Sequence, residues 1–303
     1  MLLRWGIRGC GMISSDFVHA LEALPDTEHK VVAVCTSDAS RGQDFVNKHK
    51  RAHGAKVYTS EDEFVNDENI DVVYVGSIHA YWTRFFPAFD RLRNHIANKT
   101  VGDITGSHIE FSVGHLSESS APERLTNRAL GGGVLLDIGC YNVMVAMMVF
   151  DNETPLKINA VAGRKYNSGA DNTGAVTLTF SNDRMAQLFF TANAFTPNQA
   201  VLYGTTGFIK LDNSFHTPTS LEVYKPTGPF GRHFERIEHF QSPLPKVEGA
   251  SWYFPNSEGL SYEASAVRDA IVHGQLEHPL MTLDQSLAIA RVLEEAGKQI
   301  DGN

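Results

Sequence analysis

Two kinds of hydrophobic pattern follow one another along the chain. In the first part, short apolar runs alternate with segments whose apolar residues recur every three or four positions. The apolar runs predict strands at 4–9, 30–36, 55–58 and 70–76, and the other segments predict helices at 14–24, 40–50 and 60–67. Strands and helices in alternation are typical of a parallel, doubly wound α/β sheet.

The pattern changes after Arg84. One or two helical segments are followed by runs in which every second residue is apolar, at 175–180, 185–191 and 207–211. Glycine, asparagine and aspartate turns join these runs, so we expect a mainly antiparallel open sheet. Segments 262–271 and 283–300 are predicted to be helical again, which makes this part an α+β domain.

A glycine motif, Gly9-x-Gly11-x-x-Ser14, lies between the first predicted strand and the first predicted helix. Glycine at the first position allows a tight turn, glycine at the second lets backbone N–H groups approach a pyrophosphate, and a small third residue lets the helix pack closely. The context supports nucleotide binding, because Ser14 or Ser15 can cap the helix that follows. The alternative is an ordinary glycine turn between a strand and a helix. The expected cofactor-binding residues of this loop are Gly9, Gly11, Met12, Ile13 and Ser14.

Composition narrows the class of protein. The chain has 303 residues, 42% hydrophobic and 20% charged, which suits a soluble chain with two domains. The formal charge of -9 argues against a nucleic-acid partner, and we expect no signal peptide, no apolar run of membrane-span length and no metal site. Cys10, Cys35 and Cys140 show no C-x-x-C spacing, so we expect reduced thiols in a cytoplasmic protein.

The residues after the second predicted strand indicate which dinucleotide is bound. An acidic residue there would bind the ribose 2′-hydroxyl of NAD, but Thr36 and Ser37 occupy the place and Arg41 follows. Small hydroxyl residues and a guanidinium leave room and charge for a 2′-phosphate, which favours NADP. If Asp38 turned inward, NAD would be favoured instead.

A second signature, G-G-G-V-L-L-D-I-G-C-Y, occupies residues 131–141. If a helix begins near Asp137, then Asp137 and Tyr141 stand one turn apart and can pair a carboxylate with a phenol. The alternative is that Asp137 caps the helix and Tyr141 is a core residue.

With both signatures, the chain resembles the glucose-fructose oxidoreductase and inositol dehydrogenase-like (Gfo/Idh/MocA) family, and within it the dimeric dihydrodiol dehydrogenases, also described as NADP-dependent D-xylose dehydrogenases. The further motifs that carry the resemblance are V-x-Y-V-G-S-I-H at 72–79, W-T-R-F-F-P at 82–87, G-R-K at 163–165, G-T-T-G at 204–207 and S-Y-E-A at 261–264. The resemblance implies NADP-dependent oxidation of a polyol, trans-dihydrodiol or aldopyranose. It also implies a homodimer.

One departure from the family pattern bears on catalysis. In family members, a Glu-Lys-Pro motif lies between the segment that matches 72–79 and the segment that matches 82–87. In this chain only two residues separate His79 from Trp82, and the sequence contains no Glu-Lys-Pro. A block of roughly forty to fifty residues, about two strand-helix units, is therefore absent. The resemblance implies that the missing lysine would act beside the nicotinamide and the reacting hydroxyl.

The loss of that lysine changes what Tyr141 can do. The resemblance makes Tyr141 the proton-transfer residue, but with a reference pKa of about 10 only about one phenol in a thousand is ionised at pH 7. A nearby ammonium would lower that pKa, and without one Tyr141 is a poor base. His79 is the nearest substitute, unless it is a structural histidine.

The expected architecture is a truncated Rossmann domain at residues 1–81 and a substrate and dimerisation domain at 82–303, whose C-terminal helix can pack back on the first domain. The resemblance makes Arg84 and Arg164 pocket residues and Asp137 a residue that orients a hydroxyl. The missing block should leave the apolar strand at 70–76 on a sheet edge. We expect a dehydrogenase with impaired activity, or alternatively a non-catalytic nucleotide-binding or dimer-forming subunit.

Overall fold

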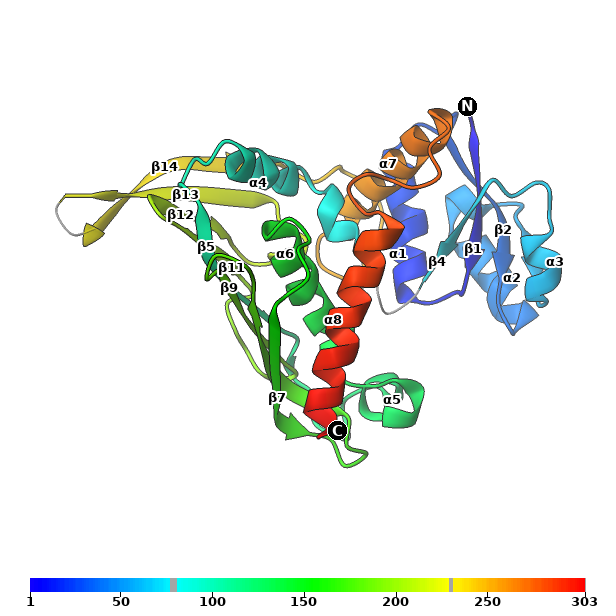
Figure 1. Cartoon of the computed structure of the whole chain (residues 1–303). Coiled ribbons are helices and arrows are strands. Elements are labelled where there is room, and N and C mark those ends of the chain that lie inside the picture. The colour runs from blue at the N-terminus through cyan, green and yellow to red at the C-terminus, as the bar shows by residue number, and fades with distance from the viewer. Residues whose placement is uncertain (77–80, 229–230, 303) are drawn as a thin grey trace. The chain divides into compact units, whose positions relative to one another are not determined.

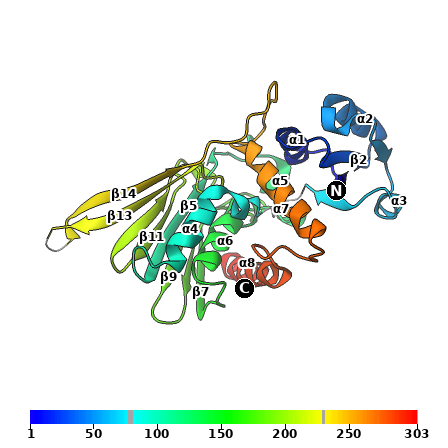
Figure 2. The same cartoon turned by 90° about the horizontal axis from the view of Figure 1, so that it is seen from above.

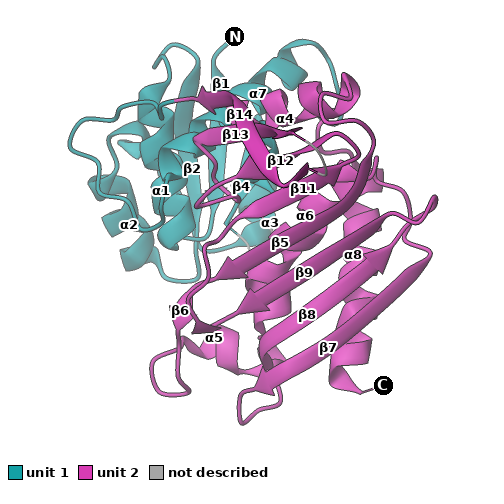
Figure 3. Cartoon of the chain, turned by 90° about the vertical axis from the view of Figure 1, so that its left-hand side faces the viewer, with its two compact units in different colours: residues 1–85, 243–278 teal, residues 86–242, 279–303 magenta. Residues whose placement is uncertain are grey.

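The protein is described from a computed structural model, in which residues 1–76, 81–228 and 231–302 are described. The chain divides into two compact units, shown in two colours in Figure 3. Unit 1 contains Met1–Phe85 and Pro243–His278, and unit 2 contains Phe86–Ser242 and Pro279–Asn303. The expected first domain, residues 1–81, thus lies in unit 1, which also takes in a segment from the expected second domain.

Unit 1 is built on a parallel sheet of four strands in the order β3-β2-β1-β4. The strands are β1 (Leu3–Arg8), β2 (His29–Cys35), β3 (Lys56–Tyr58) and β4 (Val72–Val75). The helices are α1 (Met12–Ala20), α2 (Ala39–Lys48), α3 (Glu61–Val65) and α7 (Leu260–Val272), with short 3-10 helices at η1 (Leu21–Ala23), η2 (Lys50–Ala52), η3 (Trp82–Phe85) and η7 (Ser257–Gly259). The predicted parallel α/β arrangement is confirmed (Figure 1).

Strand β4 ends the sheet, as expected from the missing block. In the part of the chain that the structure describes, it pairs only with β1. Its two faces are still covered, because Val73 packs on the cluster that contains Phe64, and Tyr74 stacks on Phe17 of α1 with ring centroids 3.8 Å apart. Val75 is 50% exposed. The edge is therefore open, while Val73 and Tyr74 of β4 are partly buried and remain in contact with the core.

Unit 2 is built on one eight-stranded sheet in the order β14-β13-β12-β11-β5-β9-β8-β7, in which only the β5–β9 pair is parallel. Its strands are β5 (Ile104–Ser112), β7 (Lys157–Lys165), β8 (Asp171–Thr179), β9 (Met185–Thr191), β11 (Ala200–Gly204), β12 (Gly207–Leu211), β13 (Ser220–Thr227) and β14 (His233–Gln241). Two short strands, β6 (Gly114–His115) and β10 (Asn193–Ala194), pair separately. The expected mainly antiparallel sheet is confirmed.

Helices α4, α6 and α8 cover one face of this sheet, and Figures 2 and 3 show its other face without helices of the described chain. The helices of unit 2 are α4 (Pro87–Ala97), α5 (Glu123–Thr126), η4 (Arg128–Leu130), the π-helix η5 (Leu135–Gly139), α6 (Cys140–Val149) and α8 (Leu283–Asp301). Helix α8 packs against β7 and α6 within unit 2, whereas α7 packs with α1 in unit 1.

One helical stretch, Arg128–Val149, is long and apolar enough by length and composition to cross a membrane. The sequence expectation that no run reaches that length is therefore wrong. However, 72% of its most apolar window is buried within the protein, because α6 packs on β5, β9 and α8. Burial of this kind is expected for a core helix of a large domain.

Candidate functional site

The glycine loop follows β1 directly. Gly9 has φ +89° and donates its N–H to the carbonyl of Cys35 at 2.8 Å, so the loop lies at the carboxyl ends of β1 and β2. A Cβ added at Gly9 or Gly11 would have no heavy atom within 4 Å, which means that the space beside both glycines is open. An open cradle of backbone at a helix N-terminus fits the pyrophosphate of a dinucleotide.

Helix α1 begins one residue after Gly11 and has no side-chain cap, so the expected capping by Ser14 or Ser15 is wrong. Ser14 is buried in the first turn, and a Cβ on Gly76 would lie only 2.4 Å from its Oγ. The small residue at the third motif position thus permits close packing of α1 against the end of β4. Met12 and Ile13 are the first two residues of the helix.

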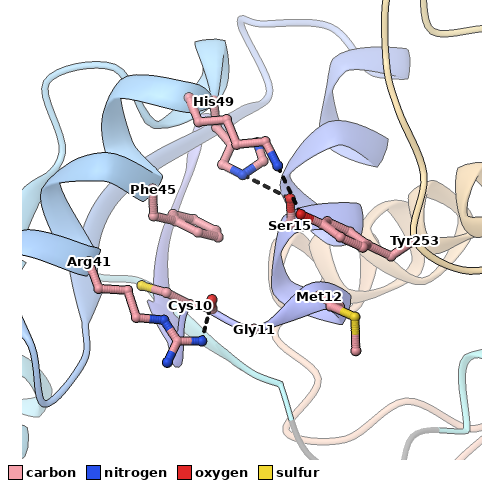
Figure 4. A pocket seen from close by; sticks show the side chains of 9 residues that line it. Cys10, Gly11, Met12, Ser15, Arg41, Phe45, His49 and Tyr253 are labelled. Atoms are coloured by element: carbon pink, nitrogen blue, oxygen red, sulfur yellow. Dashed lines mark hydrogen bonds between the residues drawn. The ribbon is translucent and has the colours of Figure 1, made fainter. Parts of the chain in front are cut away.

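A cavity of about 240 Å³ opens beside the loop (Figure 4). Helix α2 forms one wall, because Arg41, Phe45 and Lys48 lie at helical spacing along one face. The Arg41 guanidinium reaches the loop and donates to the Cys10 carbonyl at 3.1 Å. The lining residues are Cys10, Gly11, Met12, Ser15, Arg41, Phe45, Lys48, His49 and Tyr253.

The acidic residue nearest the end of β2 is Asp38. The Asp38 carboxylate caps α2 by accepting from the backbone N–H groups of Ser40 at 2.8 Å and Arg41 at 3.2 Å. Thr36 is half-buried and Ser37 is exposed. The side chain that would favour NAD is therefore engaged with its own helix.

His49 is a buried member of the cavity wall that the sequence reasoning missed. Its Nε2 lies 3.0 Å from Ser15 Oγ, and its ring meets that of His19 edge to face at 4.5 Å. Burial lowers the pKa of His49 to about 4, so the ring is neutral at pH 7. In the described residues, no group of three or more His, Cys, Asp or Glu side chains is placed to hold a metal ion.

The second signature forms an unusual helix start in unit 2. Asp137 lies inside the π-helix Leu135–Gly139, and Gly139 is the N-cap of α6, so the interpretation of Asp137 as a helix cap is wrong. The Asp137 carboxylate forms an ion pair with Arg124. Tyr141 is half-buried in the first turn of α6.

The ring of Tyr141 lies in an aromatic group. Its centroid is 5.8 Å from Phe111 of β5 and 5.5 Å from His216, both edge to face, and His216 stacks on Phe111 at 4.2 Å. Burial lowers the pKa of His216 to about 3, which keeps this imidazole neutral.

The two predicted arginines belong to different units. Arg84 is fully buried in η3 of unit 1, while Arg164 is exposed on β7, one of the two edge strands of the unit 2 sheet. His79 lies outside the described residues. The three cysteines are free, as expected.

Two family models match most of the chain. The oxidoreductase family, NAD-binding Rossmann fold, matches residues 3–92, and the GFO/IDH/MocA C-terminal domain matches residues 89–210. The trans-1,2-dihydrobenzene-1,2-diol dehydrogenases of Xenopus tropicalis and Homo sapiens are each 33% identical to this chain over 346 residues. These matches cover 99% of this chain, and 98% and 97% of the two relatives.

Solved structures show the same fold. The 3-ketoreductase KijD10 from Actinomadura kijaniata, in complex with NADP and TDP-benzene, has a TM-score of 0.75 at 18% identity, with 98% of this chain and 97% of that chain covered. The aldose-aldose oxidoreductase from Caulobacter crescentus complexed with glycerol has a TM-score of 0.77 at 16% identity, with 99% and 98% covered.

The match to the dehydrogenases also bears on the missing block. It extends over 346 residues while this chain has 303, so at least 43 aligned positions have no residue in this chain. This number agrees with the size of the block inferred to be absent from the sequence.

Proposed function

Because this chain belongs to the Gfo/Idh/MocA family of oxidoreductases, we propose that it binds NADP(H) and catalyses hydride transfer to or from a small polyol or sugar. The proposed substrate is a trans-dihydrodiol or an aldopyranose such as D-xylose. Relatives named trans-1,2-dihydrobenzene-1,2-diol dehydrogenase support a diol, and the likeness to an aldose-aldose oxidoreductase supports a sugar. The observation that carries the proposal is the open glycine loop with Arg41 against it.

The fit of a dinucleotide rests on this chain's own backbone. Gly9, Gly11, Met12, Ile13 and Ser14 would hold the pyrophosphate at the start of α1, where the N–H groups of the first helical turn and the helix dipole favour an anion. A bound nicotinamide supplies the hydride acceptor or donor.

Three observations support a preference for NADP over NAD. Arg41 is beside the loop, Thr36 and Ser37 are small, and the Asp38 carboxylate is held by backbone N–H groups of α2. A guanidinium can bind a phosphate with two parallel hydrogen bonds, so Arg41 is the proposed ligand of the 2′-phosphate.

The substrate hydroxyl must lose its proton when the carbinol is oxidised, and we assign that transfer to the Tyr141 Oη. Asp137, fixed by Arg124, would orient a substrate hydroxyl, and Arg84 and Arg164 would shape the pocket. His79 would be the substitute base.

We also propose that this proton transfer is impaired. Tyr141 meets the rings of Phe111 and His216, and the sequence lacks the Glu-Lys-Pro segment that would supply an ammonium. A phenol has a reference pKa of about 10, and the ammonium of the missing segment would have lowered that pKa by favouring the phenolate.

A second candidate function follows from the same absence. The glycine loop and the unit 2 sheet are complete, while the alignment leaves at least 43 positions unfilled. The chain would then be a cytoplasmic, non-catalytic subunit that binds nucleotide and dimerises through the open face of the unit 2 sheet. Co-purification with a full-length homologue would favour this function, and a strictly monomeric protein would remove it.

The activity is tested by following NADPH formation at 340 nm with D-xylose and with a trans-dihydrodiol. We expect turnover well below about 1 per second, the lower end of typical enzymes. Turnover at or above that value would contradict the impairment, and reduction of NAD+ in preference to NADP+ would contradict the assigned cofactor.

A further inference from the structure

We propose that Lys48 is a second cation for the 2′-phosphate of NADP(H), and that Tyr253 positions it. The assignment rests on the proposed function, and it adds two residues from outside the glycine motif to the cofactor site. Neither residue belongs to a motif that carries the family resemblance.

Lys48 and Arg41 face the same cavity. They lie seven residues apart on α2, and seven residues make about two helical turns, so both side chains project from one face of the helix. The Cys10 carbonyl and Gly11 form the opposite side of this cavity. A ligand group that enters this cavity therefore meets a wall that carries two positive charges.

The described lining of the cavity carries positive charge and no carboxylate. None of the nine lining residues is an Asp or a Glu. Among the described residues, Arg41 donates to a backbone carbonyl and Lys48 to the Tyr253 hydroxyl, and neither forms an ion pair with a carboxylate. Two cations with neutral partners beside a helix N-terminus favour a dianionic group such as a phosphate monoester.

Tyr253 makes two contacts with Lys48. Its hydroxyl lies 3.2 Å from the Lys48 Nζ, and the same ammonium lies 5.0 Å from the centre of its ring. A cation held against an aromatic face loses side-chain freedom before the ligand arrives, which lowers the entropic cost of binding.

The position of Tyr253 is fixed by α1 itself. Asp16, fully buried in that helix, accepts hydrogen bonds from the N–H of Tyr253 at 2.9 Å, the N–H of Phe254 at 3.0 Å and the Ser257 hydroxyl at 2.6 Å. The neighbouring Trp252 meets the ring of His19, also in α1, edge to face at 5.8 Å. Helix α1, which starts at the glycine loop, thus holds the segment that contains Tyr253 in place beside the cavity.

The 2′-phosphate is favoured over the pyrophosphate as the partner of Lys48. The pyrophosphate is expected at the N–H groups of α1. Lys48 instead lies on the same face of α2 as Arg41, the proposed ligand of the 2′-phosphate, and α2 is the helix that comes after the end of β2, where the adenosine ribose binds in this fold. A cation that serves the 2′-phosphate affects NADPH alone, while one that serves the pyrophosphate affects NADH equally.

The experiment is a fluorescence titration of the full chain with NADPH and with NADH, for the wild type, Lys48→Met and the matched control Lys50→Met. Lys48 and Lys50 are both exposed, so neither change should alter the unfolding midpoint. We expect Lys48→Met to weaken NADPH binding about tenfold and NADH binding less than about twofold, with Lys50→Met close to wild type. Tyr253→Phe, which keeps the ring, should weaken NADPH binding by about threefold.

Three results would overturn the assignment. An NADPH affinity of Lys48→Met no different from that of Lys50→Met removes Lys48 from the site. Equal weakening of NADPH and NADH places Lys48 at the pyrophosphate instead. A folded wild type that binds neither dinucleotide overturns the proposed function and this assignment together, whereas the first two results leave the proposed function standing.

Discussion

The surroundings of Gly11 in unit 1 and those of Tyr141 in unit 2 differ in what they can do for a charged group. Beside Gly11 the structure has an open helix N-terminus and two cations, Arg41 and Lys48, whose partners are neutral. Around Tyr141 it has the rings of Phe111 and His216, and burial keeps that histidine neutral.

This difference affects cofactor binding and proton transfer in opposite ways. An anion is stabilised by positive charge and N–H dipoles, which unit 1 supplies from residues of its own motif and of α2. A phenol that must become a phenolate needs a nearby cation, and the segment that carries the family's lysine is missing from this chain. We therefore expect cofactor binding to survive the loss of that segment better than catalysis does.

The change with the largest expected effect is Gly11→Val. Gly11 has φ −85°, which any residue adopts, and no heavy atom lies within 4 Å of an added Cβ, so the fold should tolerate the change. The side chain would instead occupy the space for the pyrophosphate, and we expect at least about a 100-fold loss of NADPH affinity by titration. Gly163→Val in the exposed strand β7 is the control, and unaltered binding by Gly11→Val would remove the cofactor from this loop.

A change of pH should act on the stability of unit 1. Burial lowers the pKa of His49 and of His29 to about 4 each, below the unfolded value of about 6.5. The unfolded state therefore binds more protons between these values, so stability is present above pH 6.5 and is lost as the pH falls towards 4. Between pH 7 and pH 5 the loss should be about 2 kcal/mol per histidine in urea unfolding.

The variant His49→Gln isolates one of these contributions. It keeps a side chain able to bond Ser15 but does not titrate, so its loss of stability between pH 7 and pH 5 should be smaller than that of the wild type. An identical pH dependence in the variant would show that His49 is not the titrating group.

A smaller effect is expected from Tyr141→Phe. Proton transfer by a working general acid or base is typically worth 10²–10⁴ in rate. Since we infer that this step is already impaired, the residual turnover should fall by less than about tenfold. A fall of 100-fold or more would show that Tyr141 still transfers the proton efficiently. The surroundings of Tyr141 would then support catalysis as well as those of Gly11 support cofactor binding. Circular dichroism checks that the variant remains folded.

The smallest effect is expected from Val75→Lys at the open edge of the unit 1 sheet. Val75 is half-exposed, so the change should alter the free energy of unfolding by no more than about 0.5 kcal/mol. A lysine at an unpaired edge discourages pairing with other chains, so light scattering should show less aggregation on heating. Strong destabilisation would mean that Val75 is covered in solution, and hence that β4 is not an edge.

The sequence predicted unit 1 well where local chemistry decides the structure. The glycine turn at Gly9 and the packing of Ser14 follow from steric rules that act within a few residues. Helix α1, however, starts at Met12 without a side-chain cap, because Ser14 is buried against Gly76 and Ser15 bonds His49. Neither tertiary contact is visible in a local capping pattern.

The candidate site was predicted in part. Arg41 was expected from its place after β2, and Lys48 could have been found from its spacing along α2. Tyr253 could not, because it reaches the cavity through the hydrogen bonds that Asp16 makes 237 residues earlier in the chain. The ion pair between Asp137 and Arg124 could not be predicted either. Asp137 lies in a π-helix, so its side chain does not have the orientation expected at the start of an ordinary α-helix.

The most direct test of the account is thermal unfolding of the purified, monodisperse chain with and without saturating NADPH. Ligand at 100 times its dissociation constant should add about 2.7 kcal/mol to the free energy of unfolding, so the account predicts a clearly raised midpoint. A folded sample whose midpoint does not change with NADPH would contradict the claim that the glycine loop still forms a cofactor site in this chain.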